Sequence, residues 1–231
     1  MKTIGLIGGM SWESTREYYR IINETVKEKL GGLHSAKIIL YSVDFEEAEK
    51  LQHQGEWEKL TELMIDAAKR VEKGGADFIL LCTNTMHKMA NEVQNNIKIP
   101  LLHIADATAK KIREKDLKKI GLLGTKFTME EYFYKGRLAA KYSLDVIIPY
   151  EKERLIVHDI IYNELCLGYI KHYSKEQLKK IIQNLVANGA EGIILGCTEI
   201  PLLIKQEDAE VELFDTTLIH ARAAVKLALK E

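Results

Sequence analysis

The sequence predicts an α/β protein made of two pseudo-symmetric half-domains, each with a four-stranded, mainly parallel sheet flanked by helices. Two observations carry this prediction. Short apolar runs alternate along the chain with longer amphipathic segments, which is typical of parallel sheets covered by helices on both faces. In addition, segments from the first half of the chain recur in the second half in the same order.

The predicted strands are short apolar runs. They cover residues 3–7, 37–43, 78–81, 101–104, 119–123, 145–148, 192–195 and 212–214. Between most of them, apolar residues spaced by threes and fours predict amphipathic helices, as in residues 57–71 and 178–186. Ser174 and Thr128, each followed three residues later by Gln or Glu, fit the capping-box pattern of a helix start.

The internal repeat sets the domain organisation. Residues 2–8 match residues 118–124 at an offset of 116, and residues 75–83 match residues 189–198 at an offset of 114 that becomes 115 after one inserted residue. We therefore expect two half-domains that face each other about a pseudo-two-fold axis, with the active site in the cleft between them. The first would comprise residues 1–105, completed by residues 211–231, and the second residues 106–210.

Composition narrows the class of protein. Lys and Arg number 33 against 34 Asp and Glu in 231 residues, which argues against a nucleic-acid or membrane-surface protein. No apolar run reaches the roughly 18 residues that a membrane span needs. We therefore expect a cytoplasmic protein whose three cysteines, Cys82, Cys166 and Cys197, are free thiols.

Cys82 and Cys197 each follow the carboxyl end of a predicted buried strand, where open α/β sheets bind ligands. Each also opens a helix-like segment, whose free N–H groups could bind a carboxylate and lower the thiol pKa to roughly 3.5–7.5. One thiolate and one thiol on opposite sides of a ligand suit removal of a proton from one face of a carbon and delivery to the other. For either cysteine alone, packing as a small buried hydrophobe is the alternative.

Residues 82–85 (Cys-Thr-Asn-Thr) and 196–199 (Gly-Cys-Thr-Glu) resemble the two signature segments of the aspartate/glutamate racemase superfamily. Residues 5–12 and 124–128 resemble its loops after the first strand of each half. The resemblance covers nearly the whole chain. It implies a homodimeric, cytoplasmic amino-acid racemase that works without pyridoxal phosphate or another cofactor, with Cys82 and Cys197 as paired acid and base. It also implies that the substrate pocket is lined by Met10, Ser11, Thr83, Asn84, Thr85, Thr125 and Thr198.

Departures from the family pattern bear on the substrate. Glu199 stands where glutamate racemases have histidine, so a glutamate racemase is not expected. Residues 44–49 are acidic where aspartate racemases often place a basic residue, and Glu164 stands where such enzymes can carry lysine. The chain therefore also resembles the broad-specificity amino-acid racemases of the family. Gln52 is a further candidate contact of the substrate.

Other interpretations remain open at this point. The superfamily includes maleate isomerases and decarboxylases that act on small diacids, and the two cysteines do not exclude these reactions. His87 and His103 could tune a thiol or could simply pack in the core, and Cys166 lies in an apolar stretch that predicts core packing. A metal-storage protein using Cys82, Cys197 and His87 has no support from metal-ligand spacing, so no metal site is expected.

Overall fold

The computed structural model describes residues 1–230, and the chain divides into two compact units. The first unit comprises Met1–Ile104 and the C-terminal segment from His220, and the second comprises Ala105–Ile219. The chain leaves the first unit at the start of helix α5 (Ile104–Arg113) and returns within α11 (Thr216–Leu229). The sequence predicts that the chain re-enters the first half-domain at residue 211. The observed boundary lies later, because residues 212–215 form a strand of the second sheet.

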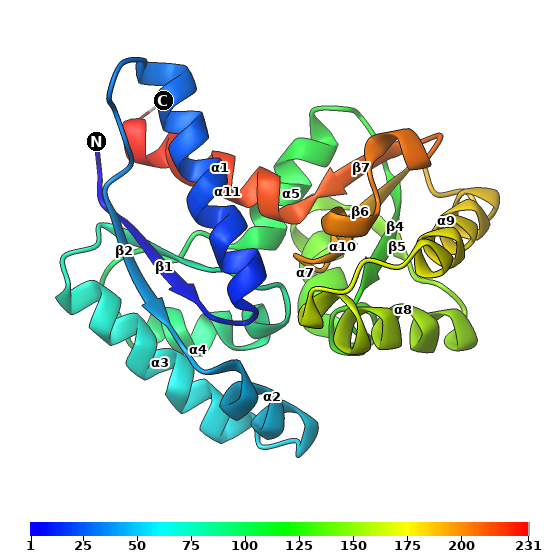
Figure 1. Cartoon of the computed structure of the whole chain (residues 1–231), viewed down its shortest axis with the longest axis horizontal. Helices are drawn as coiled ribbons and strands as arrows, with labels where there is room; N and C mark the ends of the chain where they lie inside the picture. The colour runs from blue at the N-terminus through cyan, green and yellow to red at the C-terminus, as the bar shows by residue number, and fades with distance from the viewer. Residues whose placement is uncertain (231) are drawn as a thin grey trace. The chain divides into compact units, whose positions relative to one another are not determined.

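The first unit contains a parallel sheet with the strand order β2–β1–β3. Its elements are β1 (Ile4–Gly8), α1 (Trp12–Leu30), β2 (Ile38–Ser42), α2 (Phe45–His53), α3 (Trp57–Lys73), β3 (Phe78–Leu81), η1 (Thr85–Met89) and α4 (Ala90–Asn95). Helices α1 and α3 both pack on the central strand β1 and cover its two faces (Figure 1). The expected fourth strand at residues 101–104 is reduced to one bridge between Leu101 and Ile79. Pro100 has no N–H to donate and α5 begins at Ile104, so little chain is left to pair.

The second unit contains a four-stranded parallel sheet in the order β5–β4–β6–β7. After α5, its elements are β4 (Lys119–Gly124), α6 (Lys126–Glu130), α7 (Tyr132–Tyr142), β5 (Asp145–Ile147), α8 (Glu151–Asn163), η2 (Leu165–Leu167), α9 (His172–Ala187), β6 (Gly192–Gly196), α10 (Ile200–Leu203), η3 (Gln206–Asp208) and β7 (Glu212–Asp215). The predicted fold class of two parallel sheets flanked by helices is therefore confirmed.

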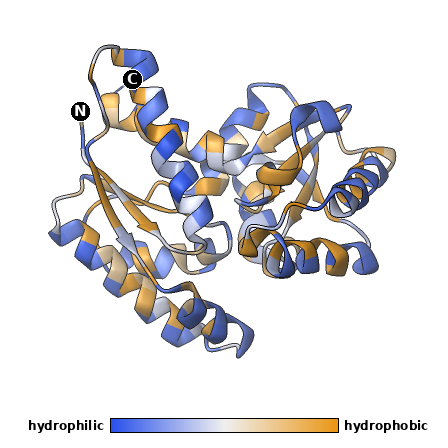
Figure 2. Ribbon diagram, in the orientation of Figure 1, coloured by the Kyte–Doolittle hydropathy of each residue, from blue (hydrophilic) through white to orange (hydrophobic). Residues whose placement is uncertain are grey.

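Helices cover both faces of each sheet, so the residues of the central strands are buried and apolar. Figure 2 shows these strands in the hydrophobic colour. In the first unit the buried face of α3 presents Leu60, Met64 and Val71 to the core. Close approach of this helix requires Gly5, because a Cβ there would lie 2.4 Å from the Val71 Cγ1 atom. Gly121, at the matching place of the second unit, would bring a Cβ to 2.5 Å from Ile193 Cδ1.

The start of a helix follows two of the strands directly. Ser11 caps α1 by accepting a hydrogen bond from the Ser14 N–H at 3.4 Å, and Thr125 caps α6 by accepting one from the Thr128 N–H at 3.3 Å. The starts predicted at Thr128 and Ser174 are therefore wrong. Thr128 lies inside α6, and α9 begins at His172, while the Ser174 hydroxyl donates to the Glu164 carboxylate instead. Within residues 1–230, no helix has the length and apolarity to cross a bilayer.

Candidate active site

In the first unit, two loops meet at the carboxyl ends of the paired strands β1 and β3. The loop after β1 is fixed by Thr15, whose hydroxyl oxygen accepts from the Gly9 N–H at 2.9 Å and whose hydroxyl donates to the Ser11 carbonyl at 2.8 Å. The loop after β3 is tied to it, because the Ser14 hydroxyl lies 3.4 Å from the Cys82 carbonyl oxygen. Parallel pairing thus brings the glycine loop and the Cys82 loop together.

The second unit repeats this arrangement at the ends of β4 and β6. Thr125 follows β4, and its hydroxyl lies 3.2 Å from the Thr128 hydroxyl. Cys197 follows β6, and its thiol donates to the Glu199 carboxylate with 2.9 Å between sulfur and oxygen. The Thr198 hydroxyl donates to the same oxygen at 2.8 Å. One buried carboxylate therefore orients both side chains.

The predicted site residues are all buried, and all but one lie on these loops or at the first residue of the following helix. Gln52 is the exception, since it lies on the buried face of α2. The first unit carries Met10, Ser11, Gln52, Cys82, Thr83, Asn84 and Thr85, and the second carries Thr125, Cys197 and Thr198. Each unit thus carries a group of polar site residues, here called a half-site, at the carboxyl ends of its central strands.

The thiols do not have the lowered pKa values expected at helix starts. Burial raises the pKa of the Cys82 thiol, and burial together with the nearby Glu199 carboxylate raises the pKa of the Cys197 thiol. The helices that follow are short: η1 begins three residues after Cys82, and α10 begins three residues after Cys197. Desolvation disfavours the thiolate, and neither short helix offsets it. Both pKa shifts are therefore opposite in direction to the expected one.

The register of the sheets corrects the sequence repeat. Ile4 pairs with Phe78 in the first sheet and Ile120 pairs with Gly192 in the second, so β3 matches β6 at a constant offset of 114. The inserted residue assumed from the sequence is absent from the strands. The Cys82 N–H donates to the Ile7 carbonyl at 2.9 Å, so the register continues past Leu81. At this offset Cys82 matches Gly196, and Thr83 matches Cys197.

Two contacts in the structure go beyond the sequence expectations. Glu199 lies two residues after Cys197, and its carboxylate contacts the Cys197 sulfur. The Nδ1 atom of His87 lies 2.8 Å from the carbonyl oxygen of Thr83, four residues earlier. The spacing of four residues along a helical turn was the available signal.

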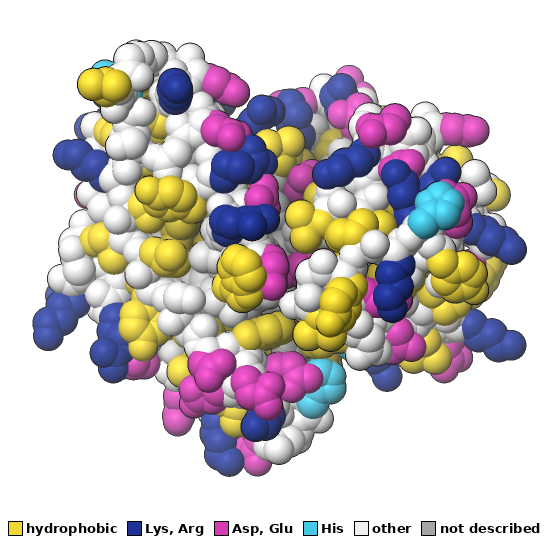
Figure 3. Space-filling view, viewed as in Figure 1, with side chains coloured by type: hydrophobic (Ala, Val, Ile, Leu, Met, Phe, Trp, Pro, Cys, Tyr) yellow, Lys and Arg dark blue, Asp and Glu magenta, His cyan; other side chains and the backbone are white. Residues whose placement is uncertain are grey.

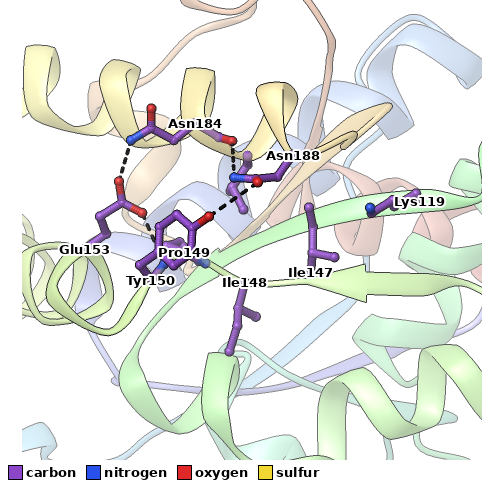
Figure 4. Close-up of a pocket in the computed structure, with 9 residues that line it drawn as sticks. Lys119, Ile147, Ile148, Pro149, Tyr150, Glu153, Asn184 and Asn188 are labelled. Atoms are coloured by element: carbon purple, nitrogen blue, oxygen red, sulfur yellow. Dashed lines mark hydrogen bonds between the residues drawn. The ribbon is translucent and has the colours of Figure 1, made fainter.

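A separate pocket of about 280 Å³ lies in the second unit and includes none of the predicted site residues. It opens between the end of β5 and the helices α8 and α9 (Figure 4). Four of its polar side chains pair with one another: Asn184 donates to Glu153 at 2.5 Å, and the Tyr150 hydroxyl lies 3.4 Å from the Asn188 side-chain oxygen. Among residues 1–230, no cluster of His, Cys, Asp and Glu side chains is placed to hold a metal ion.

Comparison with known proteins places the chain among racemases. The family model described as Asp/Glu/hydantoin racemase matches residues 7–224. A candidate Asp/Glu racemase from Yersinia pestis is 55% identical and superimposes with a TM-score of 0.92, covering 99% of this chain and 100% of that one. An aspartate racemase homologue from Pyrococcus horikoshii is 40% identical with a TM-score of 0.85, over 99% and 100% of the two chains. The broad-specificity amino-acid racemase RacX of Bacillus subtilis is 25% identical over 98% of both chains.

Proposed function

This chain belongs to the Asp/Glu/hydantoin racemase family and is an isomerase, and from that premise we propose that it interconverts the L and D forms of an amino acid without pyridoxal phosphate. The observation that carries the proposal is the repeated half-site. In each unit, two loops at the carboxyl ends of paired strands carry buried hydroxyl, amide or thiol groups. We further propose that the enzyme is a homodimer in the cytoplasm. Light scattering of the purified protein would test the dimer, and cell fractionation would test the location.

Cys197 is the proposed acid/base group of the second unit. Its thiol is protonated and donates to Glu199, so it can deliver a proton to a planar carbanion at the α-carbon. In the reverse direction the resulting thiolate accepts the α-proton. Each half-reaction breaks one bond to hydrogen and forms another, so the proton count balances without an added reactant.

For the group of the first unit the chain offers two candidates. Cys82 is the second thiol of a two-thiol scheme, and Thr83 lies at the loop position that matches Cys197 when the strand register is continued past β3 and β6. The register favours Thr83, and so does the complete burial of the Cys82 side chain. A threonine hydroxyl is a much weaker base than a thiolate. In a one-thiol scheme, removal of the α-proton would therefore be fast on the side of Cys197 and slow on the other.

The loop side chains are the proposed contacts of the amino and carboxylate groups that every amino acid shares. Hydroxyl and amide groups suit this task because they bind charged groups without changing protonation state. The proposed contacts are Ser11, Gln52, Thr83, Asn84, Thr85, Thr125 and Thr198, with Met10 as an apolar neighbour.

The α2 helix supports a substrate range wider than aspartate. Figure 3 shows its acidic side chains gathered on the surface, and Glu46 and Glu47 are exposed. The buried residues of the helix are Ala48 and Gln52, which lie one turn apart and carry no charge. In the second unit, the Glu164 carboxylate forms an ion pair with Lys171 at 3.2 Å and accepts a hydrogen bond from the Ser174 hydroxyl at 2.5 Å. The buried residues of α2 are uncharged, and Lys171 is paired with Glu164, so neither place favours a second substrate carboxylate. We therefore propose a broader set of amino acids as substrates, with aspartate alone as the narrower alternative.

Incubation of single enantiomers in deuterated water tests the function. The enzyme, treated beforehand with a carbonyl scavenger that removes pyridoxal phosphate, should incorporate deuterium at the α-carbon and form the opposite enantiomer. Cys197→Ser is the inactive control. Failure to label any of the common amino acids would reject the proposal, and turnover of maleate instead would identify the diacid isomerase of the superfamily.

A further inference from the structure

Three buried imidazoles gather in the first unit, next to the loop that follows β3. The His87 ring centroid lies 4.4 Å from that of His103 and 5.9 Å from that of His220. The Tyr18 hydroxyl, from α1, lies 2.8 Å from His220 Nδ1. All four side chains are buried, so each hydrogen bond they make is shielded from water.

The partners of His87 determine which of its nitrogens carries the proton. The Ile104 backbone N–H points at His87 Nε2 across 3.1 Å, and a backbone N–H can only donate. Nε2 must therefore hold a lone pair, and the ring proton sits on Nδ1. That proton is donated to the Thr83 carbonyl oxygen at 2.8 Å. His87 is thus a neutral imidazole with both nitrogens in use.

His87 connects the half-site to a rigid support. On one side it holds the peptide that follows Thr83, and on the other it holds Ile104, the last residue before the chain enters the second unit. The support is itself fixed, because the Leu102 N–H donates to the Ile79 carbonyl at 2.9 Å and the Leu102 carbonyl accepts from His220 Nε2 at 2.8 Å. Thr83 is therefore positioned through His87 and not through its own loop alone.

We propose that neutral His87 is a positioning residue of this enzyme, which holds the Thr83 peptide, and with it the polar groups of the first half-site, in the geometry that proton transfer requires. The inference rests on the racemase function proposed above. Misplacement of a reacting group by about 1 Å can cost roughly 100-fold in rate. The titratable groups that face His87 include His103, His220 and, behind His220, Tyr18.

Three variants test the role. Glutamine can donate to one partner and accept from the other without titrating, whereas leucine can do neither. We expect His87→Leu to lower kcat about 10- to 100-fold with KM changed less than about threefold, and His87→Gln to recover most of the loss. His53→Gln, on the exposed face of α2, is the matched control and should be unchanged. Equal kcat in wild type and His87→Leu, or equal losses in the Leu and Gln variants, would overturn the proposal.

A second measurement separates this inference from the function itself. Imidazole ¹⁵N shifts of the wild-type enzyme should report the Nδ1–H tautomer for His87, and the Thr83 to Thr85 amides should exchange with solvent at least tenfold faster in His87→Leu than in His87→Gln. If the enzyme labels no amino acid but both results hold, the function fails and the positioning stands. The Nε2–H tautomer, or equal exchange in the two variants, would refute the positioning alone.

Discussion

The Glu199 carboxylate accepts a hydrogen bond from the Cys197 thiol across 2.9 Å, and both side chains are buried. Burial and this neighbouring negative charge raise the pKa of the Cys197 thiol. The contact disfavours the thiolate and directs the S–H bond toward Glu199. In the proposed mechanism this thiol is the proton donor.

Glu199→Gln should lower the pKa of the Cys197 thiol, because it removes the negative charge that opposes the thiolate. Alkylation of Cys197 by iodoacetamide, followed peptide by peptide with mass spectrometry over a pH series, should then reach its midpoint at lower pH. We expect kcat/KM for both enantiomers to fall about tenfold or more, since less of Cys197 is then the protonated donor. Glu207→Gln, on the surface, is the control. An unchanged alkylation midpoint would show that Glu199 does not govern the thiol.

Isotope exchange can distinguish Cys82 from Thr83 as the acid/base group of the first unit. Racemisation has an equilibrium constant of one, so kcat/KM must be equal for the two enantiomers in every variant. The ratio of kcat/KM for the L and D forms therefore cannot distinguish the two schemes. If Thr83 faces the substrate, one enantiomer should exchange its α-proton with retention faster than it inverts, and Thr83→Cys should raise inversion relative to exchange. Cys82→Ala should then keep kcat within about threefold of wild type. In the two-thiol scheme the same variant loses about 10²- to 10⁴-fold.

The sequence predicted the strands well because fully buried strands of a parallel sheet are continuous apolar runs. Seven of the eight runs form strands, and each end lies within one residue of its predicted place. The eighth, at Leu101, fails because strand pairing there depends on Pro100 and on where α5 begins, which periodicity does not reveal.

The predicted match of Cys82 with Cys197 rests on residue identity at the strand ends. Register is set by backbone hydrogen bonds, and it matches Cys197 with Thr83.

Side-chain contacts were the least predictable feature. A thiol after a strand suggested a helix N-terminus and a lowered pKa, but the sequence does not show how deeply the sulfur lies or that a carboxylate approaches it. Desolvation and Glu199 reverse the direction of the expected shift. The three-histidine cluster likewise joins His87, His103 and His220, and the last is more than 100 residues distant in the chain. Such clusters require the tertiary fold.

Gly5→Ala should destabilise the first unit. The new Cβ would lie 2.4 Å from Val71 Cγ1, 2.9 Å from Ala76 Cβ and 3.0 Å from the Phe78 carbonyl oxygen, and the last two cannot move without shifting the backbone. We expect a loss of about 1–3 kcal/mol in the free energy of unfolding, as for other overpacked sites. Urea denaturation measures it. Gly74→Ala, whose Cβ would approach no atom closer than 3.3 Å, is the milder control and should cost less. Equal losses would mean that α3 tolerates displacement from the sheet.

His220 should make the folded enzyme sensitive to mild acid. Burial lowers its pKa from 6.5 to about 4, while the Leu102 carbonyl acts weakly in the opposite direction. Between these values the unfolded chain binds a proton that the folded chain does not, so stability is complete above pH 6.5 and falls as the pH approaches 4. The shift corresponds to a loss of about 3 kcal/mol over that range.

His220→Gln isolates this contribution from other acid-sensitive groups. Glutamine can accept from the Tyr18 hydroxyl and donate to the Leu102 carbonyl, the two bonds that the imidazole makes, but it does not titrate. Free energies of unfolding from urea titrations at pH 7, 6, 5 and 4 should fall less steeply in the variant, with most of the difference arising below pH 6.5. Parallel curves for the two proteins would mean that His220 is protonated within the fold. A lower free energy of unfolding of the variant at pH 7 would measure how well glutamine fits the cluster. The slope of the free energy of unfolding against pH would still report the titration of His220.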